Sequence, residues 1–487
     1  MVGDLTHRMV HGSVIPPCRF VVAGFVLLLI VLGGGSDPGR AMAAGDSDRL
    51  REAKQAIGAR QFDRALALIS PLLSENSGSL EARHVKVLAL AGLNRSQDAL
   101  AEYDRVSAKV GHDEAALLRV VLLAFIRPLL TDMREQMRGA AYTALKEFDS
   151  EESVKLFEDG LTDGSGLVRA LAVEGLGRAK GGAKSPRLRK ALEDEAAMVR
   201  TNALKVLGRS GDATGLALTD HALTDGQPMV RIAALGAQVW LGRKESVSKI
   251  REAAQRASSP EERGAALRWL SDLHDREALA LSQRAVADRQ PSVRGAAAIA
   301  LGELKTSEAE AALIGLLKDP VPPVKAAAAM SLGEFAGSES AVALTRMLQD
   351  ENPAVRAGAV GSLLAREVSY DDVSAAILDM TRQSDVGIRS VVARALGRAK
   401  GRNIPPAVSL LGMLVTDPIS RPRIVGARML GQLAIKDQTA MRERLVILKA
   451  VLRDQDEAVR ATAAGAMGRI LAGFSGQATR DDMEESR

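Results

Sequence analysis

Cysteine, histidine and aromatic residues are scarce in this sequence, and each scarcity argues against a class of structure or function. The chain of 487 residues has one cysteine, Cys18, six histidines and 3% aromatic residues. A single cysteine cannot form an intramolecular disulfide, so a packed core must supply the stability. No histidine precedes a glutamate, and the histidines beyond residue 44 do not stand at helical spacing from one another. Metal centres need clustered ligands, so this pattern disfavours one.

Motifs of catalysis and of nucleic-acid binding are also missing. The sequence has no G-x-x-x-x-G-K-[ST] phosphate-binding loop and no G-x-S-x-G nucleophile elbow. The net charge of +5 is a small excess over abundant charges of both signs, without basic clusters that alternate with aromatic residues. We therefore expect no enzymatic activity, no bound cofactor and no nucleic-acid partner.

The residues that are abundant favour helices. Hydrophobic residues make up 46% of the chain, and alanine and leucine supply much of this fraction. Strands would instead be rich in β-branched and aromatic residues. A chain of this length is too long for one compact core, unless the core is built from a repeated unit.

Residues 1–43 have the pattern of a signal peptide. Positive residues precede the apolar run Phe20–Leu32, and the small residues Ala41–Ala43 fit a cleavage site. The run has 13 residues, whereas a membrane span needs about 20. We expect cleavage near Ala43 and a periplasmic or secreted mature protein without a membrane span. An uncleaved N-terminal anchor is the alternative, and Met9 is an alternative start of translation. Cys18 precedes the run, whereas a lipid-bearing cysteine would follow it.

One phrase recurs along most of the chain. It begins with an acid, has a basic residue six positions later and continues with an apolar run, as from Asp288, Asp319 and Asp350. An acid precedes nine of the eleven basic residues, and Ala257 and Gln383 stand in the other two units. A sustained period of this length indicates a helical repeat array. The eleven basic residues, spaced by 31 to 37 positions, are Arg138, Arg169, Arg200, Arg231, Arg263, Arg294, Lys325, Arg356, Arg389, Arg423 and Arg460.

The residues that follow each of these basic anchors stand at helical spacing. Alanine stands three positions after most anchors, and leucine or methionine stands seven after all but one, where Gln238 occurs. Both positions are expected to face the core, and the alanine would let a neighbouring helix approach. Glycine eight positions after the anchor, as at Gly302, is expected to end the helix in the left-handed conformation. The acid is expected to cap the helix, and the anchor to bridge to an acid of its own or the next unit.

Each unit is therefore predicted to be a helix, a turn with the acid, a second helix with the anchor, and a loop. The pattern from 113 to 472 resembles the short HEAT-like repeats of the type found in bilin lyases, which implies an all-α superhelical solenoid of about eleven helix pairs. In that family the turn aspartate and the basic residue six positions later form a ladder through the stack. The resemblance thus implies a structural role for Asp163, Arg169, Asp194, Arg200, Asp225, Arg231, Asp288, Arg294, Asp319, Lys325, Asp350 and Arg356.

The two ends of the mature chain differ from this repeat. The segments Arg60–Ile69 and Asn94–Tyr103 align 34 residues apart, which is the tetratricopeptide period. Residues 44–112 therefore resemble a tetratricopeptide-like helical region, although the tryptophan and terminal proline of that pattern are missing. Residues 473–487 are polar and without periodicity, so we predict a disordered tail.

Solenoids of this kind expose long concave surfaces that hold other proteins. We therefore predict an exported, non-enzymatic scaffold or adaptor for a protein partner of unknown identity. The alternative is an accessory, chaperone-like or lyase-like factor for a cofactor-carrying protein. The second helices are expected to line the concave face, with positions five and nine after each anchor directed toward it.

These positions predict a groove that is basic at both ends and apolar and acidic in the middle. The basic ends would comprise Arg178, Lys205, Arg209 and Arg243 early in the chain, and Arg394, Arg398, Arg428 and Arg469 late. The middle would offer Ile299, Glu303, Met330 and Glu334. The alternative is that Ile299 and Met330 pack inward against the next helix. The candidate partner-binding residues are Arg268, Ile299, Met330, Arg394 and Arg428. Trp240 and Trp269 either stack on a ligand or fill a wide gap between helices, and we favour the second interpretation.

Overall fold

The structure is a computed structural model that describes residues 44–484, apart from 149 and 435–437. The predicted signal peptide, 1–43, and residues 485–487 lie outside the described residues. All the regular structure of the described part is helical, as the sequence predicts. None of the described helices has both the length and the apolar character needed to cross a membrane.

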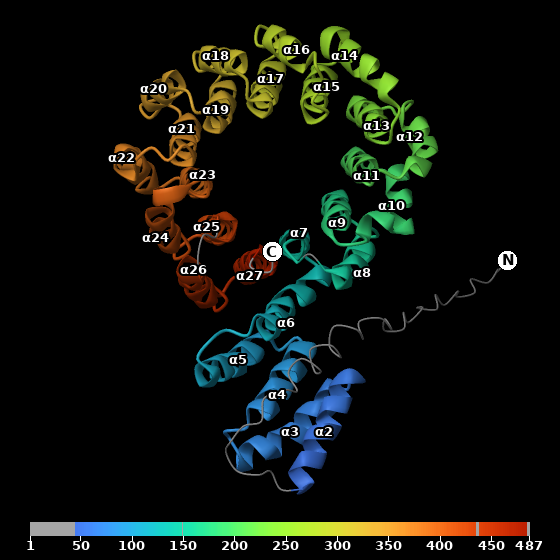
Figure 1. Cartoon of the computed structure of the whole chain (residues 1–487), viewed down its shortest axis with the longest axis vertical. Coiled ribbons are helices and arrows are strands. Elements are labelled where there is room, and N and C mark those ends of the chain that lie inside the picture. The colour runs from blue at the N-terminus through green and yellow to red at the C-terminus, as the bar shows by residue number, and fades with distance from the viewer. Residues whose placement is uncertain (1–43, 149, 435–437, 485–487) are drawn as a thin grey trace, which may run out of the picture.

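The second helices of the units form the inner layer of a two-layered ring (Figure 1). The inner layer consists of α7 (Glu135–Leu145), α9 (Gly166–Arg178), α11 (Ala197–Arg209), α13 (Pro228–Trp240), α15 (Pro260–Asp272), α17 (Pro291–Leu304), α19 (Pro322–Ser331), α21 (Pro353–Ala365), α23 (Val386–Leu396), α25 (Ser420–Gln432) and α27 (Glu457–Glu484). The solenoid of paired helices that the sequence predicts is therefore confirmed.

The first helices of the units form the outer layer (Figure 1). They are α6 (Ala115–Ile126), α8 (Glu151–Gly160), α10 (Pro186–Lys190), α12 (Leu216–Ala222), α14 (Val247–Arg256), α16 (Ala278–Ala285), α18 (Ser307–Leu316), α20 (Ser338–Met347), α22 (Tyr370–Thr381), α24 (Ile404–Leu414) and α26 (Gln438–Val451). Short 3-10 turns accompany them at η2 (Arg127–Thr131), η3 (Gly182–Lys184), η4 (Ala191–Glu193), η5 (Ala213–Gly215), η6 (Lys244–Ser246), η7 (Leu332–Glu334) and η8 (Gly401–Asn403).

The periodic alanines and leucines form the core between the layers. Ala297 and Ala328, three positions after their anchors, are fully buried, as are Leu301 and Leu332, seven positions after them. Gln238, which replaces the leucine in one unit, is also buried. Its amide nitrogen donates to the Asp220 carboxylate at 2.7 Å, and its amide oxygen accepts from the Ser246 hydroxyl at 2.7 Å. Both ends of this polar side chain are therefore satisfied inside the core.

The periodic glycines do not adopt the left-handed conformation, so that prediction is wrong. Among the described glycines, a positive φ occurs at Gly111, Gly181, Gly211, Gly242 and Gly401, none of which stands eight positions after an anchor. A Cβ atom at the periodic Gly177 would instead lie 2.6 Å from Cγ2 of Val206 on the next inner helix. A Cβ atom at Gly431 would lie 2.7 Å from Cα of Ala466. These glycines are required because neighbouring inner helices approach each other too closely for a side chain.

A ladder of basic anchors and aspartates follows the stack and joins most units to the next, with breaks where Ala257 and Gln383 replace the acid. Nε and Nη2 of Arg169 donate to both carboxylate oxygens of Asp194, at 2.7 and 2.8 Å. Nη1 of Arg169 donates to the main-chain carbonyl of Asp163, at 2.8 Å. Asp194 also accepts the backbone N–H of Ala196 at 2.8 Å and so fixes the turn before α11, although it does not cap the helix as the sequence predicts. The side-chain bridge therefore leads to the next unit. The same bidentate bridge joins Arg138 to Asp163, Arg200 to Asp225, Arg263 to Asp288, Arg294 to Asp319 and Arg389 to Asp417.

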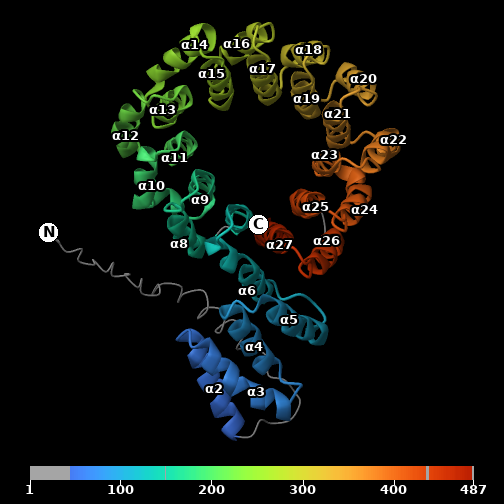
Figure 2. The same ribbon diagram turned by 180° about the vertical axis from the view of Figure 1, so that it is seen from behind.

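The array closes on itself, which the sequence did not lead us to expect. Both views show α27 beside α7, so that the last inner helix completes the ring (Figures 1 and 2). A Cβ atom at Gly465 of α27 would lie 2.8 Å from Cα of Ala144 of α7. At the equivalent place in an internal junction, a Cβ atom at Gly361 would lie 3.2 Å from Cα of Ala395. The closing junction therefore uses the same close helix packing as the internal ones.

Two ion pairs cross the closing junction. Arg134 bonds Glu457 at 2.6 Å and also Asp132, the first ladder acid, at 2.8 Å. Arg469 bonds Glu147 at 3.1 Å. Polar contacts thus accompany the glycine-mediated packing and connect the end of the ladder with its beginning.

The N-terminal helices form two hairpins, α2 (Ala44–Gly58) with α3 (Phe62–Glu75), and α4 (Leu80–Gly92) with α5 (Ser96–Val110). Arg60 and Asn94, which are 34 residues apart, both have a positive φ, of 58° and 57°. This geometry agrees with the tetratricopeptide-like assignment of 44–112, which stays a prediction.

The N-terminal region also holds the end of the ring. Gln97 donates to the carbonyl of Leu452 at 2.8 Å, Arg453 bonds Asp104 at 2.5 Å, and Lys449 bonds Asp113 at 2.6 Å. These contacts tie α5 and the segment after it to the C-terminal end of α26, beside the closing junction.

Helix α27 continues to Glu484 and so includes most of the segment that we predicted as a disordered tail. Extending a helix that packing has already nucleated costs little, and this allows a polar sequence to continue it.

Candidate functional site

The inner wall of the ring is the candidate binding surface. We define it as the side chains of the inner helices that face away from the outer layer, toward the central opening (Figure 1). Ile299 and Met330 illustrate it, because 42% and 51% of their surfaces are exposed, whereas Ala297 and Ala328 on the same helices are fully buried. The position five after the anchor is therefore exposed in these two units.

Closure of the ring brings the two predicted basic ends together. Arg178 on α9 lies 3.9 Å from the carboxylate of Glu147, and Arg469 on α27 lies 3.1 Å from the same carboxylate. One acid thus sits between cations from opposite ends of the repeat array. We call the resulting surface the basic arc, and it comprises Arg178, Lys205, Arg209, Arg394, Arg428 and Arg469.

Two arginines of the basic arc make no direct bond to an acid of the described chain. Among the described residues, neither Arg394 nor Arg428 takes part in a hydrogen bond or an ion pair. Burial, and then the positive charge of Arg421, lowers the pKa of Arg394. Burial also lowers the pKa of Arg428; Glu147 opposes this shift, whereas Arg394 adds to it. These guanidiniums are partly withdrawn from water and repel one another, so an anion beside them would be stabilised.

The opposite side of the inner wall is apolar and acidic. Ile299 and Met330 are exposed there, and Glu303 and Glu334 stand four positions after them. Arg268 is half-buried between these groups; burial lowers its pKa, and Glu303 and Asp272 oppose that shift. Of the five predicted partner-binding residues, the ring therefore places Arg394 and Arg428 on one arc, and Arg268, Ile299 and Met330 on the other.

Two arginines predicted for the basic ends have other contacts. Arg398 donates to the carbonyl of Met330 at 2.8 Å and to the hydroxyl of Ser362 at 3.2 Å, and so bridges two preceding units. Arg243 bonds Asp220 of the outer helix α12. The expectation that Arg243 faces the groove is therefore wrong, because the turn after α13 directs it to the outer layer.

The tryptophan pair fills space that glycines leave between inner helices. The Trp240 and Trp269 ring centroids are 4.6 Å apart. A Cβ atom at Gly236 would lie 2.1 Å from the Trp269 ring, and only 4% of Trp269 is exposed. Arg209 lies 5.2 Å over the Trp240 ring and Lys205 lies 5.9 Å over Trp269, so both cations are positioned by cation–π contacts. This packing agrees with the gap-filling interpretation.

Sequence reasoning missed Glu147 as part of the site. Its carboxylate is largely buried, with 18% of the side chain exposed, between Arg178 and Arg469. Glu147 stands nine positions after Arg138, so the spacing rule places it on the inner wall. Only the closure of the ring, however, makes it a neighbour of Arg469.

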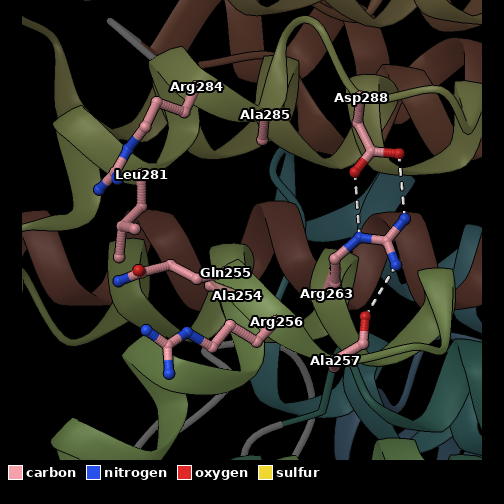
Figure 3. Close-up of a pocket in the computed structure, with 9 residues that line it drawn as sticks. All are labelled: Ala254, Gln255, Arg256, Ala257, Arg263, Leu281, Arg284, Ala285 and Asp288. Atoms are coloured by element: carbon pink, nitrogen blue, oxygen red, sulfur yellow. Dashed lines mark hydrogen bonds and ion pairs between the residues drawn. The ribbon is translucent and has the colours of Figure 1, made fainter.

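A cavity of about 470 Å³ lies in the outer layer, where Ala257 replaces a ladder aspartate (Figure 3). Arg263 on its wall already bonds Asp288 and the carbonyl of Ala257. The other cations, Arg256 and Arg284, are exposed. A larger cavity of about 690 Å³ lies at the equivalent place between α24 and α26, where the ladder acid Asp417 is present, so the missing acid does not explain the cavity. Arg231, whose ladder acid is missing, reaches Glu262 at 3.4 Å instead. The described residues also contain no group of three acidic, histidine or cysteine side chains that could hold a metal ion.

Comparison with known proteins agrees with the repeat fold. The family model of HEAT repeats matches in five overlapping segments, 154–237, 185–271, 247–333, 278–363 and 310–397. No curated protein sequence is significantly similar to the chain.

Solved structures that match the chain do so at low identity. The YibA protein of Escherichia coli is 19% identical, with a TM-score of 0.34, over 54% of this chain and 94% of that one. The complex of CpcE and CpcF of phycocyanin lyase from Nostoc sp. PCC7120 is 21% identical, with a TM-score of 0.33, over 46% of this chain and 94% of that one. Kap121p bound to Pho4p is 14% identical, with a TM-score of 0.37, over 93% of this chain and 57% of that one.

Proposed function

Because the chain belongs to the family of HEAT-repeat proteins, we propose that it is a non-enzymatic scaffold whose inner wall binds a protein partner. HEAT solenoids typically bind proteins along their concave face, and the inner wall is the concave face of this ring. The observation that carries the proposal is the chemistry of that wall. Exposed apolar side chains at Ile299 and Met330 face the same opening as the unpaired cations Arg394 and Arg428.

These two kinds of residue serve different parts of binding. Buried apolar anchors hold a complex together, whereas charges mainly steer association and fix its register. Ile299 and Met330 are large enough to act as anchors once a partner covers them. The arginines opposite would attract acidic parts of the same partner.

Site-specific photocrosslinking in native extract tests this function. A photoreactive residue at position 299 or 330 should capture a defined protein, because both side chains face the opening. Val342 on α20 and Met413 on α24 are matched controls, because 54% and 67% of their surfaces are exposed on the outer layer. Capture at the outer positions alone, or the same weak pattern at all four, would contradict a binding role for the inner wall.

A double substitution tests whether the anchors contribute to affinity. Ile299→Asp with Met330→Asp should abolish partner capture while circular dichroism and the melting temperature stay near those of the wild type. The control is Val342→Asp with Met413→Asp on the outer layer. A double variant that stays folded and captures the partner normally would place the binding surface elsewhere.

We also propose that the protein is exported, on the evidence of the apolar run Phe20–Leu32 and the small residues that follow it. N-terminal sequencing of native protein should give a mature terminus at Ala44 or close to it. Recovery of the chain with residues 8–40 intact from a membrane fraction would contradict cleavage.

A further inference from the structure

The charges of the basic arc do not balance. Glu147 lies between Arg178 and Arg469. Glu174, the carboxylate five positions after an anchor on α9, bonds Lys146 at 2.5 Å and also lines a cavity with Arg178, Lys205 and Arg209. No other acid of the inner positions on these helices faces Lys205, Arg209, Arg394 or Arg428 within the described part of the chain. The arc therefore carries a net positive charge that the protein does not itself neutralise.

The arc is long enough for an extended polypeptide segment. It runs along the inner wall from α23 through α25, α27, α7 and α9 to α11 (Figures 1 and 2). Packed helices lie about 8–10 Å apart, so these steps span roughly 40–50 Å. An extended chain advances about 3.3 Å per residue, so a segment of roughly a dozen residues would follow the whole arc. A small anion would contact only a fraction of it.

The aromatic residues beside the arc argue against a single-stranded nucleic acid. Such a ligand uses accessible aromatic faces on which bases stack. Trp269 is 4% exposed and packs against Gly236, and Arg209 lies over Trp240. The wall therefore offers guanidinium and ammonium groups for carboxylates but no open stacking platform.

From charge complementarity and length, we propose that the basic arc binds one acidic peptide segment of the protein partner, across the junction of α27 and α7. This proposal rests on the proposed function, because it names the segment that part of the inner wall would hold. The sequence predicted two separate basic ends of the groove. In the closed ring these two ends lie side by side and form one surface, and the proposal concerns that surface.

Charge reversal on each side of the junction tests the proposal. The early pair is Arg178→Glu with Arg209→Glu, and the late pair is Arg394→Glu with Arg428→Glu. The control pair is Arg284→Glu with Arg346→Glu, whose arginines are exposed on outer helices α16 and α20. All three pairs change the net charge equally. The probe is a fluorescein-labelled oligoglutamate peptide, and its binding to the purified protein is followed by anisotropy.

We expect the early and the late pair each to weaken binding by about tenfold or more, a change that corresponds to about 1.4 kcal/mol. The control pair should stay within about twofold of the wild type, since rim charges away from a site mainly change long-range steering. Added salt should weaken wild-type binding and affect both arc variants less, because they retain fewer charge contacts. Should a reversal pair unfold, Arg394→Gln with Arg428→Gln tests the same side with a smaller change of charge.

Several outcomes would overturn the proposal. If only one pair weakens binding, the arc does not act as a single surface. If the control pair weakens binding as much as the arc pairs, only net charge matters. Tighter binding of inorganic polyphosphate or of an oligonucleotide with the same charge would assign the arc to a phosphate polymer.

The result is separable from that of the photocrosslinking experiment. If oligoglutamate fails to bind while positions 299 and 330 still capture a protein, the acidic segment is wrong and the scaffold function stands. If oligoglutamate binds as predicted but the inner wall captures no protein, the scaffold function fails on its own.

Discussion

Replacing Gly465 with leucine should open the ring at its closing junction. A Cβ atom at this position would lie 2.8 Å from Cα and 2.9 Å from Cβ of Ala144. Both distances are too short for carbon atoms, and the first involves the backbone, which cannot rotate away. Overpacking of this kind costs about 1–3 kcal/mol, whereas replacing a helical glycine gains at most about 1 kcal/mol in propensity. The clash should therefore outweigh the gain.

The closing junction is also where the array can relieve a clash most readily. Internal junctions are held by a bidentate ladder bridge such as Arg294 to Asp319. The closing junction instead relies on packing, on the pairs of Arg134 with Glu457 and of Arg469 with Glu147, and on the contacts of the N-terminal region with the end of α26. Partly exposed pairs of this kind contribute about 0–1 kcal/mol each. Separation of α27 from α7 should thus be the main response to Gly465→Leu.

Small-angle X-ray scattering measures this response. The variant should show a larger radius of gyration and a larger maximum dimension than the wild type. Gly295→Leu is the matched control, because no atom lies within 4 Å of a Cβ placed at that helical glycine. If the two variants scatter alike and melt alike, α27 and α7 do not pack together in solution, and the reasoning fails.

The remaining predictions concern the ladder and the core. Asp350→Ala should cost about 1–3 kcal/mol, measured by urea unfolding, because it leaves the backbone N–H of Asn352 without its acceptor and leaves Lys325 unpaired. The bond of Arg356 to the main-chain carbonyl of residue 350 should survive. Leu332→Ala should cost about 2–5 kcal/mol, because it truncates a fully buried side chain. Hydrogen exchange should show that the loss of protection is confined to neighbouring units. Arg294 lowers the pKa of Asp319 in the folded protein. The stability that this bridge gives is therefore complete above the pKa of aspartate in the unfolded chain, about 3.9, and is lost as the pH falls through the lower, folded pKa. Asp319→Asn should flatten that part of the pH profile, and an unchanged profile would contradict a stabilising ladder.

The sequence predicted the repeat and the core because both depend on local pattern. Alanine three positions and leucine seven positions after an anchor lie on one face of a helix, so their burial follows from helical geometry alone. The ladder was also predictable, because an acid and a base six positions apart recur in register. The sequence could not predict whether the anchor bridges to an acid of its own unit or of the next unit, because that depends on how successive units stack.

The closure of the ring could not be predicted from the same pattern. Curvature accumulates from a small rotation at each unit, and no single unit encodes the total. The contacts that close the ring, such as Arg134 with Glu457, join residues 323 positions apart. Gly465 and Gly468 were available signals, because a glycine on an inner helix indicates a close neighbour, and the last helix of an open array would have none.

The candidate site was predicted in its residues but not in its arrangement. Helical spacing placed Ile299 and Met330 on the exposed inner face, where they lie. It did not bring the early and late arginines together, because their adjacency exists only in the closed ring. Helical spacing also did not predict that Arg243 bonds Asp220 and that Arg398 bonds the carbonyl of Met330. These partners lie at different distances along the chain, so no fixed spacing indicates them.

The distance between the two ends of the repeat array tests the closed ring most directly. Met133 and Gln455 suit spin labels, because both are exposed and each lies within two residues of the ion pair of Arg134 with Glu457. Two residues span at most about 7 Å of chain, so double electron–electron resonance should give one short distance. In an open array, eleven inner helices at about 8–10 Å spacing would separate the labels by on the order of 100 Å. A single short distance is the result that the closed ring predicts, and a distance distribution without a short component would contradict it.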